Sequence, residues 1–260
     1  LRKGEKVLIH SATGGVGLAA VQIAQMLGAE IFATAGSPRK RAYLRKLGIK
    51  HVMDSRSLDF ADEVMAKTNG AGVDIVLNAL AGRAIDKGLS VLAPFGRFLE
   101  IGKRDVYGNS PVGLRALSRN ITFHVIDLAN VTANHADRVA GVFEDMNALF
   151  AEKKLLPLPT DEFPIGKAAD AFHHMSRAKH IGKVVVTTDD PSLEIERAVD
   201  RPITLRADGA YLVTGGLGGF GLEVSRWLAE HGAGCLILVG RSGAASESAK
   251  AAVATLRRRG

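Results

Sequence analysis

The chain has 260 residues, of which 47% are hydrophobic and 23% charged, an ordinary globular composition that argues against a disordered or fibrous protein. No run of 18 apolar residues is present, so no membrane span is predicted, and the single Cys235 excludes an internal disulfide and a cysteine zinc cluster. The net charge is +7, but basic residues are scattered, aromatic residues make up 5%, and no zinc-finger or RNA-binding signature occurs, so we expect no nucleic-acid partner.

Strand and helix patterns alternate over the first 150 residues. Short apolar runs predict strands, and longer periodic stretches predict helices. The predicted strands are Val7–His10, Ile31–Thr34, His51–Met53, Val73–Asn78, Arg97–Ile101 and Ile121–Ile126. The predicted helices are Val16–Leu27, Arg39–Leu47, Leu58–Lys67, Ala84–Leu92 and Asp137–Lys153. Near-continuous apolar strands separated by helices indicate a doubly wound parallel sheet, an α/β fold of the Rossmann type.

The pattern changes after residue 159 and later restarts. A helix at Lys167–Ala178 and a strand at Lys183–Thr187 precede a charged stretch with two prolines, which we predict to be a linker. Beyond it we predict strands at Tyr211–Val213 and Leu236–Val239, and helices at Glu223–Glu230 and from about Ala244. We therefore expect a nucleotide-binding lobe with a C-terminal return segment at 1–188, a linker at 189–208, and the opening βαβ of a second Rossmann domain at 209–260. The chain ends inside a predicted helix, so we expect a fragment of a longer protein and a truncated fold.

A glycine-rich turn joins the first predicted strand to the first predicted helix. It reads Ala12-Thr13-Gly14-Gly15-Val16-Gly17, which fits G-x-G-x-x-G with alanine in the first place. A side chain at Gly14 would keep a pyrophosphate from the backbone, Gly17 allows close helix–strand packing, and the helix N-terminus attracts the anion. The turn predicts a dinucleotide site at residues 13–17, with a purely structural glycine turn as the alternative.

The end of the second predicted strand indicates which dinucleotide binds. An NAD site would place Asp or Glu there, whereas this strand runs into Gly36-Ser37-Pro38-Arg39-Lys40. A carboxylate would repel a 2′-phosphate, while Ser37 and Lys40 are suited to bind one, so NADPH is favoured. Arg56, after the third strand, is a candidate second clamp or a plain surface arginine.

A second glycine-rich turn lies in the restarted pattern. The segment from Thr214 to Gly221 reads T-G-x-x-x-G-x-G, and the next strand ends Val239-Gly240-Arg241, again without an acid. The candidate cofactor-binding residues here are Gly215, Gly219, Phe220, Gly221 and Arg241. Two different NADPH turns in one chain predict two different reductases joined in one polypeptide.

Five segments of the first part stand out together: His10–Gly17, Phe32–Ser37, Asp74–Gly82, Phe98–Lys103 and Lys179–Val184. In combination they resemble the enoyl reductase domains of reducing polyketide synthases and animal fatty acid synthase, in the zinc-free branch of the medium-chain dehydrogenase/reductase superfamily. The stretch from Asp208 resembles the opening of a short-chain-type ketoreductase domain. The resemblance implies NADPH-dependent reduction of an α,β-unsaturated acyl thioester on an acyl carrier protein, other synthase domains as partners, and no metal. We also expect a cytoplasmic location; dimers are common in the family.

Lys103 and Asp127 are the predicted catalytic residues. Each falls just past the carboxyl end of a predicted strand, at the edge that faces the ligand crevice in an open parallel sheet. A lysine there can supply a proton or a hydrogen bond to an enolate, and a carboxylate can orient it and keep it charged. These positions match the lysine and aspartate implicated in the resembled family; the alternative is a surface lysine and a helix-capping aspartate. Asn78, Ala79 and Gly102 are predicted to border the coenzyme, although a simple strand-end turn would also account for Asn78 and Ala79.

Two other functions stay open. One is a quinone-oxidoreductase-like NADPH reductase. The second strand–helix pattern at 209–260 argues against it, because free-standing quinone reductases end near the position of Val186. The other is a non-catalytic NADPH-binding scaffold module, against which the Lys103 and Asp127 pattern weighs. Lys183 could touch substrate or cofactor, but a packing role for its strand is favoured. Since most of the substrate lobe of the family would precede Leu1, we expect this chain to bind NADPH but to turn over poorly by itself.

Overall fold

The computed structural model describes residues 1–190, 193, 203–241 and 243–257. Contacts divide the chain into two compact units, 1–193 and 194–260. The predicted linker at 189–208 falls largely on residues 191–192 and 194–202, which lie outside the described residues, so the predicted domain limits stay a prediction.

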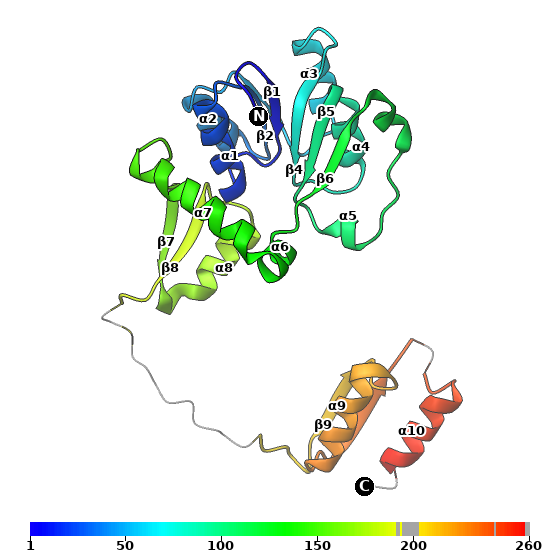
Figure 1. Ribbon diagram of the computed structural model, residues 1–260. Helices are drawn as coiled ribbons and strands as arrows, with labels where there is room; N and C mark the ends of the chain where they lie inside the picture. The colour runs from blue at the N-terminus through cyan, green and yellow to red at the C-terminus, as the bar shows by residue number, and fades with distance from the viewer. Residues whose placement is uncertain (191–192, 194–202, 242, 258–260) are drawn as a thin grey trace. The chain divides into compact units, whose positions relative to one another are not determined.

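Six parallel strands form the central sheet of the first unit, in the order β3-β2-β1-β4-β5-β6 (Figure 1). In chain order β1 to β6 are Lys6–Ile9, Glu30–Ala35, His51–Asp54, Val73–Asn78, Leu92–Glu100 and Thr122–Val125. This is the strand order of a dinucleotide-binding Rossmann sheet, in which the direction of winding reverses between β1 and β4. The predicted doubly wound α/β fold is confirmed.

Helices cover both faces of this sheet, which explains why its strands are apolar almost without interruption. The helices α1 to α4 are Gly15–Met26, Pro38–Lys46, Phe60–Lys67 and Arg83–Ser90. Side chains of β1 alternate between two cores: Val7 and Ile9 belong to the cluster with α1 and α2, and Leu8 to the cluster with α3 and α4. Burial on both faces holds the strand ends, and therefore the loops that follow them, in fixed positions.

The predicted boundary between α4 and β5 is wrong. The helix predicted at Ala84–Leu92 ends at Ser90, and β5 begins at Leu92, five residues before the predicted strand. Leu92 pairs with Val73 of β4, so sheet pairing takes this residue away from the helix. Beyond β5 the chain forms α5 (Arg104–Tyr107), a 3₁₀ helix (Leu114–Arg119), α6 (Leu128–Asn134) and α7 (Ala136–Ala151). Of these, only α7 was predicted.

A small separate sheet ends the first unit. The strands β7 (Thr160–Pro164) and β8 (Lys183–Thr187) pair in parallel around α8 (Ala168–Ser176), as Figure 1 shows. Just before β8, the N–H of Gly182 donates to the carbonyl of Thr13 at 2.8 Å, and Gly182 forms a parallel bridge with Gly14. The return segment therefore contacts the first glycine turn.

The second unit is a βαβ unit followed by a helix. It consists of β9 (Ala210–Thr214), α9 (Gly219–Glu230), β10 (Cys235–Val239) and α10 (Glu247–Arg257), and the two strands pair in parallel. The predicted opening of a second Rossmann domain is confirmed, although its last helix starts three residues later than predicted. Across both units, no helix in the described part of the chain has the length and apolar character needed to cross a membrane.

Candidate coenzyme site and active site

The candidate residues of the first unit lie at or after the carboxyl ends of parallel strands. The glycine turn follows β1, Ser37 follows β2, Arg56 follows β3, Lys103 follows β5 and Asp127 follows β6. Because the strands run in the same direction, these loops emerge at one edge of the sheet, where ligands of such sheets bind.

Two glycines of the first turn differ in what the fold demands of them. A Cβ on Gly17 would lie 2.5 Å from the carbonyl oxygen of Ser11 and 2.6 Å from Cα of Ala12, so α1 packs on β1 only with glycine there. A Cβ on Gly14 would meet nothing closer than 3.4 Å, and its φ of −77° suits any residue. The fold does not require glycine at Gly14, whereas close approach of a ligand to the backbone would.

The N-terminus of α1 is open to an anion. Its first turn carries no acidic side chain, and its N-cap, Gly14, has no side chain to accept a hydrogen bond. The first amides of a helix lack partners within the helix and carry partial positive charge, so this end favours a phosphate group. Within the turn, Thr13 is buried and Val16 is exposed. These residues fit the diphosphate of a dinucleotide.

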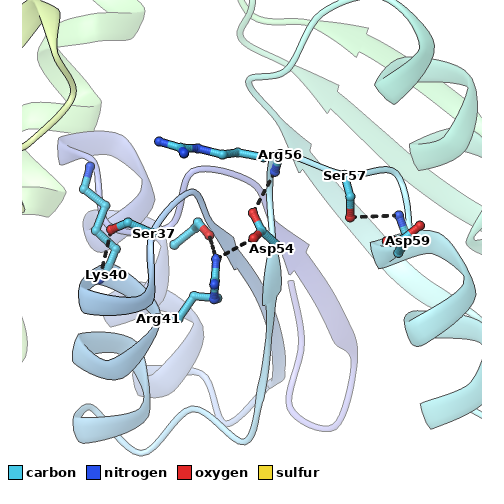
Figure 2. A network of polar contacts seen from close by, with 8 residues as sticks. Ser37, Lys40, Arg41, Asp54, Arg56, Ser57 and Asp59 are labelled. Carbon is cyan, nitrogen blue, oxygen red and sulfur yellow. Dashed lines mark hydrogen bonds and ion pairs between the residues drawn. The ribbon is translucent and has the colours of Figure 1, made fainter.

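Ser37, Lys40 and Arg56 come together at the ends of β2 and β3 (Figure 2). Ser37 is the N-cap of α2, and its Oγ accepts from the N–H of Lys40 at 3.4 Å. Burial, followed by the charges of Arg39 and Arg56, holds the pKa of Lys40 below its usual value. The Arg56 side chain crosses Gly36, where a Cβ would lie 3.4 Å from Nε, and extends toward the Lys40 side of the site.

An aspartate that the sequence reasoning missed supports this group. Asp54, the last residue of β3, accepts from Nη1 of Arg41 at 2.8 Å and from the backbone N–H of Arg56 at 2.9 Å. Arg41 also donates to the carbonyl of Ala35 at 3.1 Å. Among the described residues no carboxylate pairs with Lys40 or Arg56. The Asp54 charge is therefore taken up by Arg41, and two cations remain for an anionic ligand.

Lys103 and Asp127 meet at the ends of β5 and β6. Lys103 Nζ lies 2.9 Å from Asp127 Oδ1, with the lysine side chain half exposed and the aspartate less so. The adjoining strands place them: Glu100 pairs with Val125, and the N–H of Ile126 donates to the carbonyl of Glu100 at 2.8 Å. Asp127 is also the N-cap of α6. The ion pair and the helix cap are therefore both present in the structure.

Tyr107 completes a three-residue group that the sequence reasoning missed. Its hydroxyl donates to Asp127 Oδ2, and its ring centre lies 5.9 Å from Lys103 Nζ. The hydrogen bonds from Tyr107 and then from Lys103 lower the pKa of Asp127 to about 2. The bond to Asp127 raises the pKa of Lys103 and also that of Tyr107. The lysine is thus held as an ammonium and the tyrosine as a phenol.

Asn78 and Gly102 donate hydrogen bonds to a buried carboxylate, that of Glu100, and Ala79 follows Asn78 in the chain. Nδ2 of Asn78 donates to Glu100 Oε2 at 2.6 Å, and the N–H of Gly102 donates to Glu100 Oε1 at 2.5 Å. Burial raises the pKa of Glu100, although both hydrogen bonds act the other way. Asn78 also donates to the carbonyl of Leu80 at 2.7 Å, so its amide nitrogen binds within the protein. The contact of these residues with a coenzyme stays a prediction.

The second unit presents its own glycine turn. Gly215 has φ +69° and Gly219 has φ +50°, which favour glycine, and a Cβ on Gly221 would clash with the carbonyl of Gly215. Phe220 is largely exposed at the start of α9, and Arg241 is exposed after β10. The turn is a complete strand-to-helix connection, and a coenzyme role for its residues stays a prediction.

No metal centre is formed by the residues described. Within those ranges, no three His, Cys, Asp or Glu side chains lie close enough together to hold an ion. His174, one of the adjacent histidines on α8, instead pairs with Asp161 at 2.9 Å.

Family models match both units of the chain. The model described as zinc-binding dehydrogenase matches residues 15–150, and the model described as KR domain matches residues 209–260. Together they account for most of the chain and follow each other in the order that the sequence predicted. The first family uses a nicotinamide coenzyme, so the first unit carries a nicotinamide coenzyme fold.

Curated relatives are mycobacterial polyketide synthases. A phenolphthiocerol/phthiocerol polyketide synthase polypeptide of Mycobacterium tuberculosis is 49% identical over 257 residues, which is 98% of this chain and 12% of that protein. Phthioceranic/hydroxyphthioceranic acid synthase of the same organism is 43% identical over 244 residues, 93% of this chain and 11% of that protein. The chain thus spans about an eighth or less of the length of these relatives.

Solved structures agree with this assignment. The nucleotide-binding subdomain of the enoyl reductase domain of PpsC from Mycobacterium tuberculosis is 51% identical with a TM-score of 0.58, covering 60% of this chain and 87% of that one. The CurK enoyl reductase is 45% identical with a TM-score of 0.64, covering 72% and 55%. A quinone oxidoreductase of Pseudomonas syringae is 26% identical with a TM-score of 0.61, covering 72% and 57%.

The identities are higher for the enoyl reductases than for the quinone oxidoreductase, and the KR match follows the first unit directly. The chain belongs to the zinc-binding dehydrogenase family, where it groups with the enoyl reductase domains of polyketide synthases, and it continues into the opening of a KR domain.

Proposed function

We propose that the first unit binds NADPH and reduces the carbon–carbon double bond of an α,β-unsaturated acyl thioester, presented by an acyl carrier protein, within a polyketide synthase. The observation that carries this proposal is the Lys103–Asp127 ion pair at the edge of the sheet where the coenzyme turn also emerges. Other synthase domains are the expected partners, and a homodimer is a candidate assembly.

The preference for NADPH rests on the end of β2. Two cations, Lys40 and Arg56, approach each other there without a carboxylate partner among the described residues, and Ser37 stands beside them. A 2′-phosphate placed between them would form charge-assisted hydrogen bonds with both cations. The unphosphorylated coenzyme would leave the two cations facing each other, so NADPH should bind more tightly than NADH.

The chemistry that NADPH would supply when bound is a hydride for the β-carbon of the enoyl thioester. The electron pair of the double bond would then join the α-carbon to the carbonyl carbon, whose C=O π pair moves onto the thioester oxygen, where negative charge develops. The ammonium of Lys103 supplies a hydrogen bond and a compensating charge to that oxygen, or delivers the proton that the α-carbon needs. Asp127 orients the ammonium and keeps it charged, and Tyr107 keeps Asp127 ionised.

Turnover by the complete synthase polypeptide tests this function. NADPH oxidation is followed with a 2-enoyl thioester, a quinone and a 3-keto thioester, and the product mass is recorded. The proposal expects the enoyl thioester to gain two hydrogens while the Lys103→Ala variant loses this activity but still binds NADPH. Reduction of the quinone alone would establish the quinone reductase instead. NADPH binding without turnover of any substrate would establish a scaffold role.

The product mass is recorded because proteins with this fold give more than one kind of product. The CurF ER cyclopropanase of the curacin A pathway is 42% identical with a TM-score of 0.67, covering 72% of this chain and 55% of that one. A cyclopropanated product would redirect the assignment from enoyl saturation while leaving the coenzyme site intact.

For the second unit we propose a role as the opening of a ketoreductase domain. The glycine turn between β9 and α9, together with Arg241 after β10, supports a second NADPH site there. Binding of two NADPH molecules per chain, reduced to one when the second turn is disrupted by Gly221→Val, would agree with this role. A single NADPH per chain in both proteins would contradict it.

A further inference from the structure

Lys183, which lies near the C-terminal end of the first unit in the sequence, packs over the first glycine turn. Lys183 opens β8, and its backbone N–H donates to the carbonyl of Pro159 at 3.0 Å. The preceding Gly182 has φ +81°, and a Cβ there would clash with the same carbonyl, so only glycine fits. With the 2.8 Å bond from Gly182 to Thr13, these contacts fix where the Lys183 side chain starts.

The Lys183 side chain runs across the first residue of α1. Measured from the place where a Cβ would stand on Gly15, Lys183 Cδ is 2.8 Å away, Nζ 3.5 Å and Cε 3.7 Å. Gly15 does not have a positive φ in this structure. The room that a side chain at this position would fill is therefore occupied by the lysine stem, and the exposed ammonium lies beside the N-terminus of the helix.

This position is unfavourable for a cation unless an anion joins it. The N-terminus of a helix carries partial positive charge, which repels an ammonium. Across the part of the chain that the structure describes, no carboxylate pairs with Lys183. A phosphate group between the helix end and the ammonium would receive hydrogen bonds from both, and the repulsion would become attraction.

The same return segment also contacts the cationic residues at the start of α2. Nη1 of Arg39 donates to the carbonyl of Lys179 at 3.4 Å, at the start of α2 beside Lys40. The segment 179–183 therefore runs from the cluster at the end of β2 to the glycine turn after β1, along the line that a dinucleotide of this fold follows.

We propose that Lys183 is a coenzyme-binding residue whose ammonium binds the diphosphate of the nicotinamide coenzyme opposite the N-terminus of α1. The proposal rests on the proposed function, which places NADPH in this site. Two sets of cations would then bind different parts of the coenzyme. Lys40 and Arg56 recognise the 2′-phosphate, which only NADPH has, and Lys183 recognises the diphosphate, which NADPH and NADH share.

Binding measurements on the 260-residue chain separate these two roles. Calorimetry with NADPH, NADH and adenosine 2′-monophosphate is carried out for the chain with the native Lys183, for Lys183→Met and for Lys183→Arg, with Lys40→Met as the matched control, all in the Gly221→Val background, which removes the second site proposed above. Methionine keeps an unbranched stem over Gly15 but removes the charge, and thermal unfolding checks that each variant folds. Loss of one charge-assisted hydrogen bond corresponds to about a tenfold weaker binding.

Lys183→Met is expected to weaken the binding of NADPH and of NADH by the same factor of about ten and to leave the affinity for adenosine 2′-monophosphate unchanged. Lys183→Arg is expected to bind both coenzymes with an affinity close to that of the chain with the native Lys183. Lys40→Met is expected to weaken NADPH and adenosine 2′-monophosphate but not NADH. Unchanged affinity of folded Lys183→Met for both coenzymes, or a loss confined to NADPH, would overturn the role of Lys183 and leave the proposed function standing. Failure of the chain with the native Lys183 to bind either coenzyme would overturn both.

Discussion

Lys103 Nζ and Asp127 Oδ1 lie 2.9 Å apart although 23 residues separate them in the chain, because β5 and β6 are adjacent and each residue follows the end of its strand. The hydrogen bond to Asp127 raises the pKa of the lysine above its ordinary value, and the hydrogen bonds from Tyr107 and then from Lys103 lower the pKa of the aspartate to about 2. Both groups are consequently charged throughout the range in which enzymes work, and the following expectations depend on that.

The variant Asp127→Asn should lower enoyl reduction by the synthase about 100-fold, since the lysine loses its orienting charge. Asparagine is also a good N-cap, so α6 should stay intact. Without the carboxylate the pKa of Lys103 falls, and the loss of activity at high pH should begin at a lower pH than in the wild type. The pH profile of kcat/KM measures this shift, with NADPH affinity as the control. An unshifted profile with full activity would remove the pair from the mechanism.

The variant Tyr107→Phe removes the largest cause of the low pKa of Asp127. The pKa of this carboxyl should rise from about 2 toward its ordinary value of 3.8, which carboxyl NMR titration of the labelled chain measures directly. Tyr43→Phe, on α2, is the matched control and should leave the Asp127 titration unchanged. A titration of Asp127 that is identical in wild type and Tyr107→Phe would contradict the hydrogen bond.

Gly14→Ala and Gly17→Ala form a pair with opposite expected results. At Gly14 a methyl group has room, so Tm should change by less than about 2 °C while NADPH affinity falls at least tenfold, because the methyl group occupies the approach to the backbone. At Gly17 the methyl group would lie 2.5 Å from the Ser11 carbonyl, so stability itself should fall, by about 2 kcal/mol or more. Thermal unfolding and calorimetry distinguish the two. Equal loss of stability in both variants would refute this division.

The buried His10 makes the first unit sensitive to acid. Its Nδ1 lies 3.0 Å from Thr34 Oγ1, no partner for Nε2 is found among the described residues, and burial lowers its pKa to about 4. Between the ordinary pKa of 6.5 and about 4, the unfolded chain binds a proton that the folded chain does not. The free energy of unfolding should therefore fall by up to about 3 kcal/mol as pH drops through that window, and not further below it on account of this residue.

Urea unfolding followed by far-ultraviolet circular dichroism measures this pH dependence, because the only tryptophan, Trp227, lies in the second unit and does not report on the first. His10→Asn should have a lower free energy of unfolding near neutral pH, because the substitution disturbs a buried site. Because asparagine does not titrate in this range, that free energy should fall less toward pH 4 than in the wild type. If both proteins lost the same free energy over that interval, His10 would not be the cause.

The sheet could be predicted from the sequence because strands that are buried on both faces are apolar at nearly every position. Val7, Leu8 and Ile9 are all apolar, and each belongs to a core on one side or the other. The strand β7 leaves no such mark, since Thr160-Asp161-Glu162 is polar and only partly buried, and its pairing with β8 depends on residues far along the chain.

The site was predictable where it depends on strand ends and not where it depends on short helices. Lys103 and Asp127 follow predicted strands, so their approach could be inferred from sheet geometry. Tyr107 reaches Asp127 only because α5 turns the chain once after Lys103, and a four-residue helix is too short to show periodicity. Glu100 was missed because it lies in an otherwise apolar strand end, and the sequence does not show that Asn78 and the N–H of Gly102 donate hydrogen bonds to its carboxylate.

The bond between Gly182 and Thr13 has a consequence for synthesis on the ribosome. The six strands of the sheet are complete once Val125 has emerged from the exit tunnel, yet the segment that covers the nucleotide turn is still untranslated. A nascent chain halted at that stage would have a complete six-stranded sheet, but its first glycine turn would still lack the contact with Gly182. The contact between Gly182 and the first glycine turn is therefore among the last parts of this lobe to form, just before translation reaches the segment that the KR domain model matches.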